Sequence, residues 1–141
     1  MATKPTKGFT LMELTIVLAL LAIIAAILIP MFLITTDRAR LRSDIQSARV
    51  IQNAIDLYRV ERGREVQGGT NVTAIMQNLA NAGYLDLRNA EIQTQDAVWI
   101  RDAERGVVVS IAASPDSVHR AYANLPDSER QMVRGGRTGG S

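Results

Sequence analysis

The side chain with the clearest chemistry in this sequence is Glu13, a lone carboxylate directly before a long apolar run. From Leu14 to Thr36 the chain carries no charged residue. An ionised carboxylate costs roughly 2.5 to 3.5 kcal/mol at the centre of a membrane helix, and less near the end of one. Glu13 therefore either has a cationic partner or begins a helix whose N-terminal dipole stabilises it. From this residue alone both interpretations stay open.

Catalytic constellations are not evident elsewhere in the chain. His119 is the only histidine, and its neighbours Asp116 and Ser117 on a short helix do not make a triad by themselves. The pattern predicts an exposed helix histidine. Asp102 and Glu104 fit a solvated turn better than a glycosidase acid pair, which needs carboxylates across a cleft. There is no cysteine and no Walker or dinucleotide glycine pattern, so we expect no enzyme and no cofactor.

The uncharged run after Glu13 is long enough to cross a membrane. Its length, roughly 23 residues, exceeds the about 20 residues that a helix needs to span the hydrocarbon core. A signal peptide has a shorter apolar core and then a small-residue cleavage site, and the stretch IPMFLITTDRA offers no clear site of that kind. A plain membrane anchor fits the length, but it explains neither Glu13 nor the glycine before Phe9.

The stretch GFTLMELTIVLALLAIIAAILIP closely resembles the N-terminus of the type IV pilin family, which includes the pseudopilins of type II secretion and of competence. The resemblance covers residues 4 to about 34. It combines a short basic leader ending in Gly8, then Phe9, then Glu13 as the fifth residue after the break, then Pro30 late in the run. It implies that prepilin peptidase cuts between Gly8 and Phe9 and that the new N-terminal Phe9 is methylated.

The implied cut would give Glu13 a partner. An ammonium group at Phe9 would lie four residues upstream on the same face of a helix, so the carboxylate could neutralise the amine of its own chain or that of a neighbour. In the family, the pairing with a neighbour draws a new subunit into register within a filament. With Gly8, Phe9 and Pro30 in place, we prefer this assembly role to that of a simple helix-start residue.

Pro30 predicts a kink or a local opening of the helix. It cannot donate a hydrogen bond to the carbonyl of Ala26, and its ring clashes there. Prolines are tolerated in membrane helices, so coincidence is the alternative. In the family this position marks a kink, and in several filaments a segment that loses helicity on packing.

The charges argue against a general affinity for nucleic acid. The sequence has 16 Lys+Arg against 14 Asp+Glu, but both lysines precede the apolar run, which leaves 16 − 2 = 14 arginines from Phe9 onward. These 14 arginines equal the 14 acids in number, so this part of the chain is formally neutral.

The basic residues around the apolar run bear on its orientation in a membrane. Counting Arg38, Arg40 and Arg42 after the span does not favour a cytoplasmic N-terminus. We still expect that orientation, because large domains translocate largely regardless of charge and the resemblance implies it.

Beyond the apolar run, the helix is predicted to continue with one apolar face. Gly63 is its expected end, so it would run from about Phe9 to Arg62, roughly 80 Å at 1.5 Å per residue. The apolar side chains recur at steps of three and four: Leu41, Ile45, Ala48, Ile51 or Gln52, Ile55 and Tyr58.

The first part of the remaining chain predicts a short helix and a hairpin. The segment VTAIMQNLANAGYLD reads as the helix, with Thr73 as a cap and Gly83 at its end in the left-handed conformation. AVWIR and VVVSIA then form a hairpin across DAERG, with Val107, Val109 and Ile111 facing the long helix.

A second short helix is predicted in SPDSVHRAYANL, where Ser114 would cap the helix and Pro115 suits its first turn. The predicted fold class is therefore α+β and pilin-like, a long N-terminal helix packed against a small head with a β-hairpin and short helices. The expected parts are a prepilin leader (1–8), the transmembrane and filament-core half of the helix (9–36), its amphipathic half (37–62), a small globular head (63–134) and a flexible tail (135–141).

A calcium site in the head would mark the major pseudopilin of type II secretion. The stretch like Asp-Pro-Trp-Gly that is usual in that branch is absent. Asp86, Glu91 and Asp96 supply oxygens, but their spacing matches no EF-hand loop. We therefore expect no metal.

Three functional classes remain. The preferred one is a structural subunit of a type IV pilus-like filament, and the alternative is a pseudopilin of type II secretion or of a competence DNA-uptake pilus. A single-span membrane-anchored enzyme or receptor is the remote third. A competence pilus would add nucleic acid as a partner and needs basic side chains on the head, for which the available ones are Arg101, Arg105, Arg120, Arg134 and Arg137.

The resemblance also implies partners and a location. The partners are further copies of the chain in a homo-oligomeric filament, prepilin peptidase, and an inner-membrane assembly platform with an ATPase motor. The location is the inner (cytoplasmic) membrane with the N-terminus in the cytoplasm, followed by a periplasmic or cell-surface filament.

Overall fold

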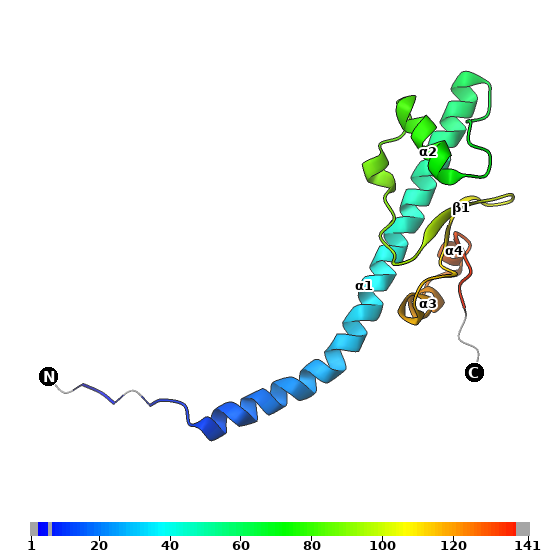
Figure 1. The fold of residues 1–141 in the computed structure, drawn as a ribbon. Coiled ribbons are helices and arrows are strands. Elements are labelled where there is room, and N and C mark those ends of the chain that lie inside the picture. Colours follow the sequence, from blue (N-terminus) through cyan, green and yellow to red (C-terminus); the bar gives the residue numbers. More distant parts are fainter. Residues whose placement is uncertain (1–2, 6, 138–141) are drawn as a thin grey trace. The chain divides into compact units, whose positions relative to one another are not determined.

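The computed structural model describes residues 3–5 and 7–137 (Figure 1). The chain divides into two compact units, Met1–Leu33 and Ile34–Ser141. Helix α1, Leu11–Arg62, has 52 residues and contributes to both units. The predicted long helix is therefore confirmed.

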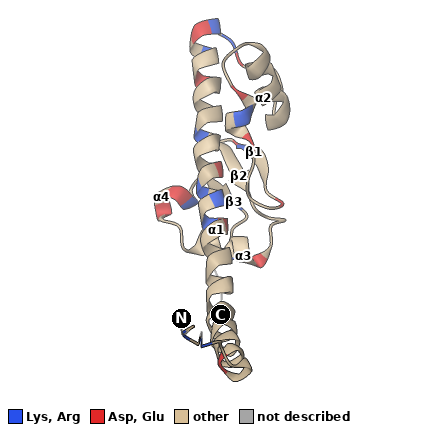
Figure 2. Cartoon of the chain, turned by 90° about the vertical axis from the view of Figure 1, so that its left-hand side faces the viewer, with Lys and Arg blue, Asp and Glu red and all other residues tan. Residues whose placement is uncertain are grey.

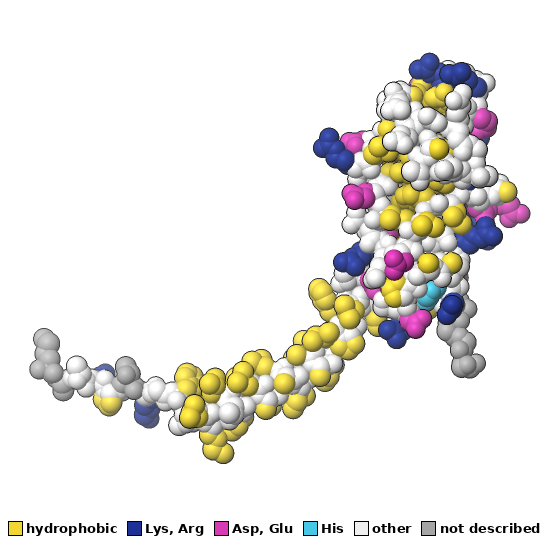
Figure 3. Space-filling view, in the orientation of Figure 1, with side chains coloured by type: hydrophobic (Ala, Val, Ile, Leu, Met, Phe, Trp, Pro, Cys, Tyr) yellow, Lys and Arg dark blue, Asp and Glu magenta, His cyan; other side chains and the backbone are white. Residues whose placement is uncertain are grey.

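The first unit consists mainly of the apolar half of α1. Within α1, an 18-residue window has a mean hydropathy of 3.1 and none of it is buried inside the protein. Figure 3 shows apolar side chains covering this part of the helix. Among the described residues, α1 is the helix long and apolar enough to cross a membrane. Side chains this apolar and this exposed need lipid or other protein around them.

Pro30 lies inside α1, and the assigned helix is not interrupted there. The missing N–H removes one hydrogen bond to the preceding turn, which a long helix tolerates between intact turns. The kink at Pro30 stays a prediction.

The second unit is built on the other half of α1, and Figure 2 shows charged residues along this part of the helix. One face of the helix is buried, with Leu41, Ile45, Ile51 and Ile55 each at most 1% exposed. Gly63, with φ +64°, follows the last helical residue, as predicted. The remaining elements are α2 (Val72–Asn81), the 3₁₀ helix η1 (Leu87–Ala90), β1 (Val98–Asp102), β2 (Gly106–Ser110), α3 (Asp116–Ala123), α4 (Asp127–Arg130) and β3 (Val133–Arg134).

The sheet has three strands in the order β1-β2-β3. The predicted hairpin is confirmed, because β1 and β2 pair antiparallel with Trp99 opposite Val109. The third strand was not predicted. It pairs parallel to β2, with Val109 donating to the carbonyl of Met132 and Ile111 to that of Arg134, both at 3.0 Å. The predicted α+β class is confirmed by this head and the long helix.

The interior of the second unit is one apolar cluster. It joins the buried face of α1 to side chains of the hairpin and of the short helices. Val107, Val109 and Ile111, predicted to face the long helix, are fully buried in this cluster. Burial of this kind contributes about 25 cal/mol per Å² of apolar surface and holds an otherwise marginal hairpin.

Two predicted helix caps are wrong. The cap of α2 is Asn71 rather than Thr73, and its side chain accepts a hydrogen bond from the N–H of Ala74 at 3.2 Å. The cap position of α3 is Pro115, which makes no side-chain cap bond. Ser114 instead donates from Oγ to the carbonyl of Gln95 at 2.7 Å, a tertiary contact with no local signal in the sequence.

Candidate functional site

The start of α1 is fixed by a reciprocal pair of hydrogen bonds between Thr10 and Glu13. The N–H of Glu13 donates to Thr10 Oγ1 at 3.2 Å, and the N–H of Thr10 donates to Glu13 Oε2 at 3.4 Å. This is a capping box, which satisfies N–H groups that the first helical turn leaves unpaired. Glu13 thus performs the helix-start role in this structure.

The residues before this cap lie outside the helix. Gly8 and Phe9 are exposed, with Phe9 at 88%, and they belong to no helix or strand. Lys7, Gly8 and Phe9 line a shallow surface hollow together with Thr10 and Glu13. The Gly8–Phe9 bond therefore lies in an accessible segment outside any helix or strand, beside the carboxylate.

The fold does not explain why residue 8 is a glycine. A Cβ added at Gly8 would meet nothing within 4 Å, and its φ does not lie in the left-handed region. Neither packing nor backbone conformation therefore requires a glycine at position 8. The structure thus brings Gly8, Phe9 and Glu13 together, while Pro30 lies further along α1 and outside this hollow. The roles predicted for these four residues stay predictions.

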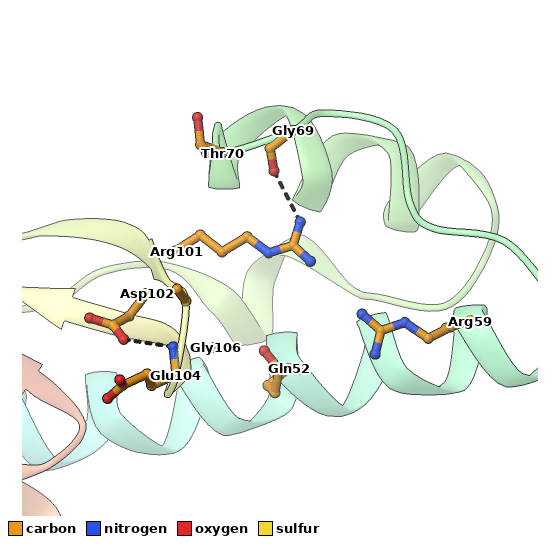
Figure 4. A pocket seen from close by; sticks show the side chains of 9 residues that line it. Gln52, Arg59, Gly69, Thr70, Arg101, Asp102, Glu104 and Gly106 are labelled. Atoms are coloured by element: carbon orange, nitrogen blue, oxygen red, sulfur yellow. Dashed lines mark hydrogen bonds between the residues drawn. The ribbon is translucent and has the colours of Figure 1, made fainter.

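The second unit has a polar groove between α1, the Gly69–Thr70 loop and the turn of the hairpin (Figure 4). Arg101 from β1 donates from Nη1 to the carbonyl of Gly69 at 3.0 Å. Glu65 joins two arginines, because its carboxylate lies 2.7 Å from Arg59 Nε and 3.5 Å from Arg101 Nη2. These ion pairs of Glu65 connect the end of the long helix, at Arg59, to the sheet, at Arg101.

Hydrogen bonds lower the pKa of two acids, Asp102 in this groove and Glu65 beside its arginines. The hydrogen bond from Arg59 lowers the pKa of Glu65, and the charges of Arg59 and Arg101 act in the same direction. The same contact raises the pKa of Arg59. The backbone N–H groups of Glu104 and Arg105 lower the pKa of Asp102. Asp102 thus belongs to a hydrogen-bonded turn, and these charges stabilise structure without forming an acid–base pair.

Gln52 attaches the hairpin to α1. Its side-chain oxygen accepts from the N–H of Val107 at 3.1 Å, and its side-chain nitrogen donates to Asp56 Oδ1 at 3.0 Å. A Cβ added at Gly106 would collide with this amide. The sequence could not assign this role, because Gln52 reads only as an alternative to Ile51 on the buried face.

Asp44 is a buried carboxylate that sequence reasoning missed. It is fully buried, and it accepts hydrogen bonds from the N–H groups of Gln93 and Thr94, both at 2.8 Å. The one signal in the sequence is its spacing, since it lies three residues after Leu41 on the apolar face. A buried carboxylate has to be hydrogen-bonded, and here it holds an irregular segment against the helix.

The exposed histidine predicted at position 119 is wrong. His119 is 6% exposed, and its Nδ1 accepts a hydrogen bond from the N–H of Arg137 at 3.3 Å. The chain after β3 passes across α3, with Gly136 packed close against Tyr122. This packing buries the imidazole, and no local pattern could have predicted it.

Metal ligands do not converge within the described residues, where no group of three or more His, Cys, Asp or Glu side chains could hold an ion. Of the acids considered for calcium, Asp86 caps η1 by accepting from the N–H of Arg88.

Comparisons with known proteins agree with the geometry at the N-terminus. Residues 3–29 match the family model described as the prokaryotic N-terminal methylation motif. The chain is 21% identical over 124 residues to type II secretion system core protein G of Escherichia coli (strain K12), which covers 82% of this chain and 86% of the relative. It is 20% identical over 121 residues to protein G of Klebsiella pneumoniae, covering 79% and 86%.

A third relative matches a shorter part of the chain at higher identity. Prepilin peptidase-dependent protein A of Clostridium perfringens (strain 13 / Type A) is 39% identical over 54 residues, which is 38% of this chain and 39% of that protein. No solved structure gives a significant match.

The fold and the N-terminal motif define the class: this chain is a membrane-anchored, pilin-like protein. It carries the prepilin-type N-terminal motif and is homologous to protein G of type II secretion systems.

Proposed function

We propose that prepilin peptidase cuts this chain between Gly8 and Phe9, that Phe9 is methylated, and that the mature subunit assembles into a homo-oligomeric filament through α1. The observation that supports this proposal most directly is that the Gly8–Phe9 segment is exposed, non-helical and beside Glu13. The segment lies within the residues that match the N-terminal methylation motif. A peptidase needs its substrate in extended form, and the Thr10–Glu13 cap keeps this segment out of the helix.

Glu13 has a different role before and after the cut. In the precursor it caps its own helix. Cleavage creates an ammonium group at Phe9, which attracts the carboxylate more strongly than a neutral N–H does. In a filament, the amine of one subunit pairs with Glu13 of another, which brings two charges in an apolar environment together.

The system that best fits is a pseudopilus of the type II secretion kind. Protein G relatives align with most of this chain, including its head, whereas the prepilin peptidase-dependent relative aligns with 38% of it. A competence pilus gains little from the arginines of the head, because Arg101 lies beside Glu65 and Arg134 lies 3.6 Å from Asp102.

The remaining parts of the proposal concern assembly and location. Before assembly the subunit sits in the inner membrane with its N-terminus in the cytoplasm. An assembly platform with an ATPase motor extracts it into a filament, because subunits exposing this much apolar surface do not leave lipid unaided. The domain boundaries at 8/9 and 36/37, and a kink at Pro30 on packing, belong to the same proposal.

The direct test is the N-terminal sequence and intact mass of the protein from membranes of cells with and without prepilin peptidase. We expect a chain that begins at methylated Phe9 only where the peptidase is present. Gly8→Val should abolish the cut while leaving the fold unchanged, because the site has open space. An intact leader in the presence of the peptidase, or a cut beyond Pro30, would refute the proposal.

Assembly is tested separately from cleavage. Glu13→Ala should be cut normally and yet enter no filament, as judged by shearing and pelleting of filaments from the cells. Glu104→Ala, which removes an exposed carboxylate on the hairpin turn, is the control and should assemble. Normal filaments from Glu13→Ala would refute the assembly role proposed for Glu13.

A further inference from the structure

Three arginines follow the uncharged run of α1 within a few residues: Arg38, Arg40 and Arg42. The run ends at Thr36 and has about the length of a bilayer's hydrocarbon core. In a membrane-anchored chain the first of these arginines therefore lies where the hydrocarbon gives way to the headgroup layer, which is about 5 to 7 Å deep on each side.

The acids nearby compensate these arginines only in part. Arg42 Nε lies 2.9 Å from Glu129 Oε2, and Arg40 Nη1 lies 3.8 Å from Asp37 Oδ1, a loose contact between half-exposed and more buried side chains. Asp44 supplies nothing, because its buried carboxylate already accepts two backbone N–H groups.

Arg38 has no such partner. No ion pair or hydrogen bond of the Arg38 side chain occurs among the residues that the structure describes, and its Nε is buried without an acceptor. A guanidinium group carries five N–H donors in a planar fork that matches the oxygens of a phosphate. Leaving a buried donor of a charged group unpaired is costly. The chain itself covers this Nε, so an acceptor outside the chain would bind the Nη groups of the half-buried side chain.

We propose that Arg38, with Arg42 one helical turn further along the same side of α1, binds the phosphate of an anionic phospholipid in the leaflet from which the helix emerges. Residues four apart on a helix lie side by side, so one phosphate can contact both. Arg42 retains N–H groups that Glu129 does not use. A net positive charge favours an anionic lipid over a zwitterionic one, whose choline cancels the phosphate.

This site would also remove a conflict in the charge pattern. Arginines that follow a membrane span oppose the export of the segment behind it. Anionic lipid at the point of emergence would neutralise Arg38 on the exported side. The inference requires the membrane anchor alone and is independent of cleavage and filament assembly.

The test uses the full chain reconstituted in vesicles of phosphatidylcholine mixed with phosphatidylglycerol, then extracted in mild detergent. Mass spectrometry gives the ratio of the two lipids that remain on the protein. We expect enrichment of phosphatidylglycerol, and an about fivefold loss of it in Arg38→Gln, the change expected for one basic residue near an anionic surface. Arg38→Lys keeps the charge and should keep part of the enrichment.

The matched control is Arg64→Gln, which removes the same charge from an exposed residue beyond the end of α1. It should bind lipid as the unmodified chain does. Equal enrichment in Arg38→Gln, or equal losses in both variants, would overturn the proposal. A third result would also overturn the proposal: the unmodified chain shows no lipid preference, and Arg38→Gln lowers the yield of filaments. The partner of Arg38 would then be an acid of a neighbouring subunit. Failure of the Glu13→Ala or peptidase experiments would leave this result unchanged.

Discussion

At the scale of single residues, Asp44 connects the long helix to chain far away in sequence. Its carboxylate accepts two backbone N–H groups at 2.8 Å in a site without solvent. The segment from η1 to β1 has little regular structure, so these bonds replace the pairing that a helix or strand would give its backbone.

Asp44→Ala should lower the free energy of unfolding by about 3 kcal/mol, because it leaves two buried N–H groups without an acceptor. Asp44→Asn keeps one side-chain oxygen and should lose less. The check is urea unfolding followed by fluorescence of Trp99, the single tryptophan. Equal losses in the two variants would show that the charge, rather than the hydrogen bonds, is what the site needs.

Glu65 makes a second residue-scale contribution, and this one depends on pH. Its pKa is lowered by Arg59, so its stabilising effect is complete above the ordinary carboxyl pKa of about 4.3 and is lost as the pH falls through the lowered value. The stability difference between the unmodified chain and Glu65→Gln should therefore be constant near neutral pH and should vanish in acid. Thermal unfolding at pH about 7 and about 3 measures it. A difference that grows on acidification would contradict the assigned contact.

At the scale of elements, the turn of the hairpin is held against α1 through Gln52. Gly106 has φ +77° and no room for a Cβ beside that amide. Gly106→Ala should destabilise the protein by more than the about 1 to 2 kcal/mol that a left-handed backbone costs an ordinary residue.

A matched control isolates the contact with Gln52. Gly69 has φ +58° but nothing within 4 Å of an added Cβ, so Gly69→Ala should show the backbone cost alone. The comparison is made by urea unfolding of both variants. If both lose the same stability, the approach of Gln52 contributes nothing.

The elements that the sequence predicted correctly are those whose signal is local. The helix ending at Gly63, the helix over α2 and the hairpin each follow from periodicity or turn residues within one short window. The strand β3 has only two residues and exists because β2 offers it an edge. Thr73 and Ser114 have side chains of a type that often caps helices. In the structure, however, Asn71 caps α2, and Ser114 makes a tertiary hydrogen bond instead of capping α3.

The same distinction holds for the candidate site. Gly8, Phe9 and Glu13 could be selected from the sequence because a processing motif is a set of residues close together in the chain and does not depend on tertiary packing. The burial of Asp44 and His119 could not, because each depends on a segment more than ten residues away that packs across its helix.

At the scale of the whole molecule, the two units differ in what surrounds them. The apolar side chains of Met1–Leu33 are exposed, whereas Ile34–Ser141 contains the buried cluster. A fragment of residues 34–141 should therefore fold and remain soluble without detergent, because it retains that cluster and omits the apolar run.

Circular dichroism and size-exclusion chromatography test this expectation. The fragment should be monomeric and unfold cooperatively, and Asp44→Ala should lower its midpoint just as it does in the full chain. Aggregation of the fragment, or a broad transition, would mean that the apolar half of α1 is needed to complete the head.

The hydrogen bonds of Asp44 have a consequence for how such a chain diverges. The carboxylate accepts hydrogen bonds from the main-chain N–H groups of Gln93 and Thr94, and neither of these bonds involves their side chains. The exposed residue at position 93 can therefore change while the segment keeps its path, whereas proline, which lacks the N–H, is barred from both positions 93 and 94. A single acid on the helix thus fixes the path of the segment without fixing the identity of residue 93.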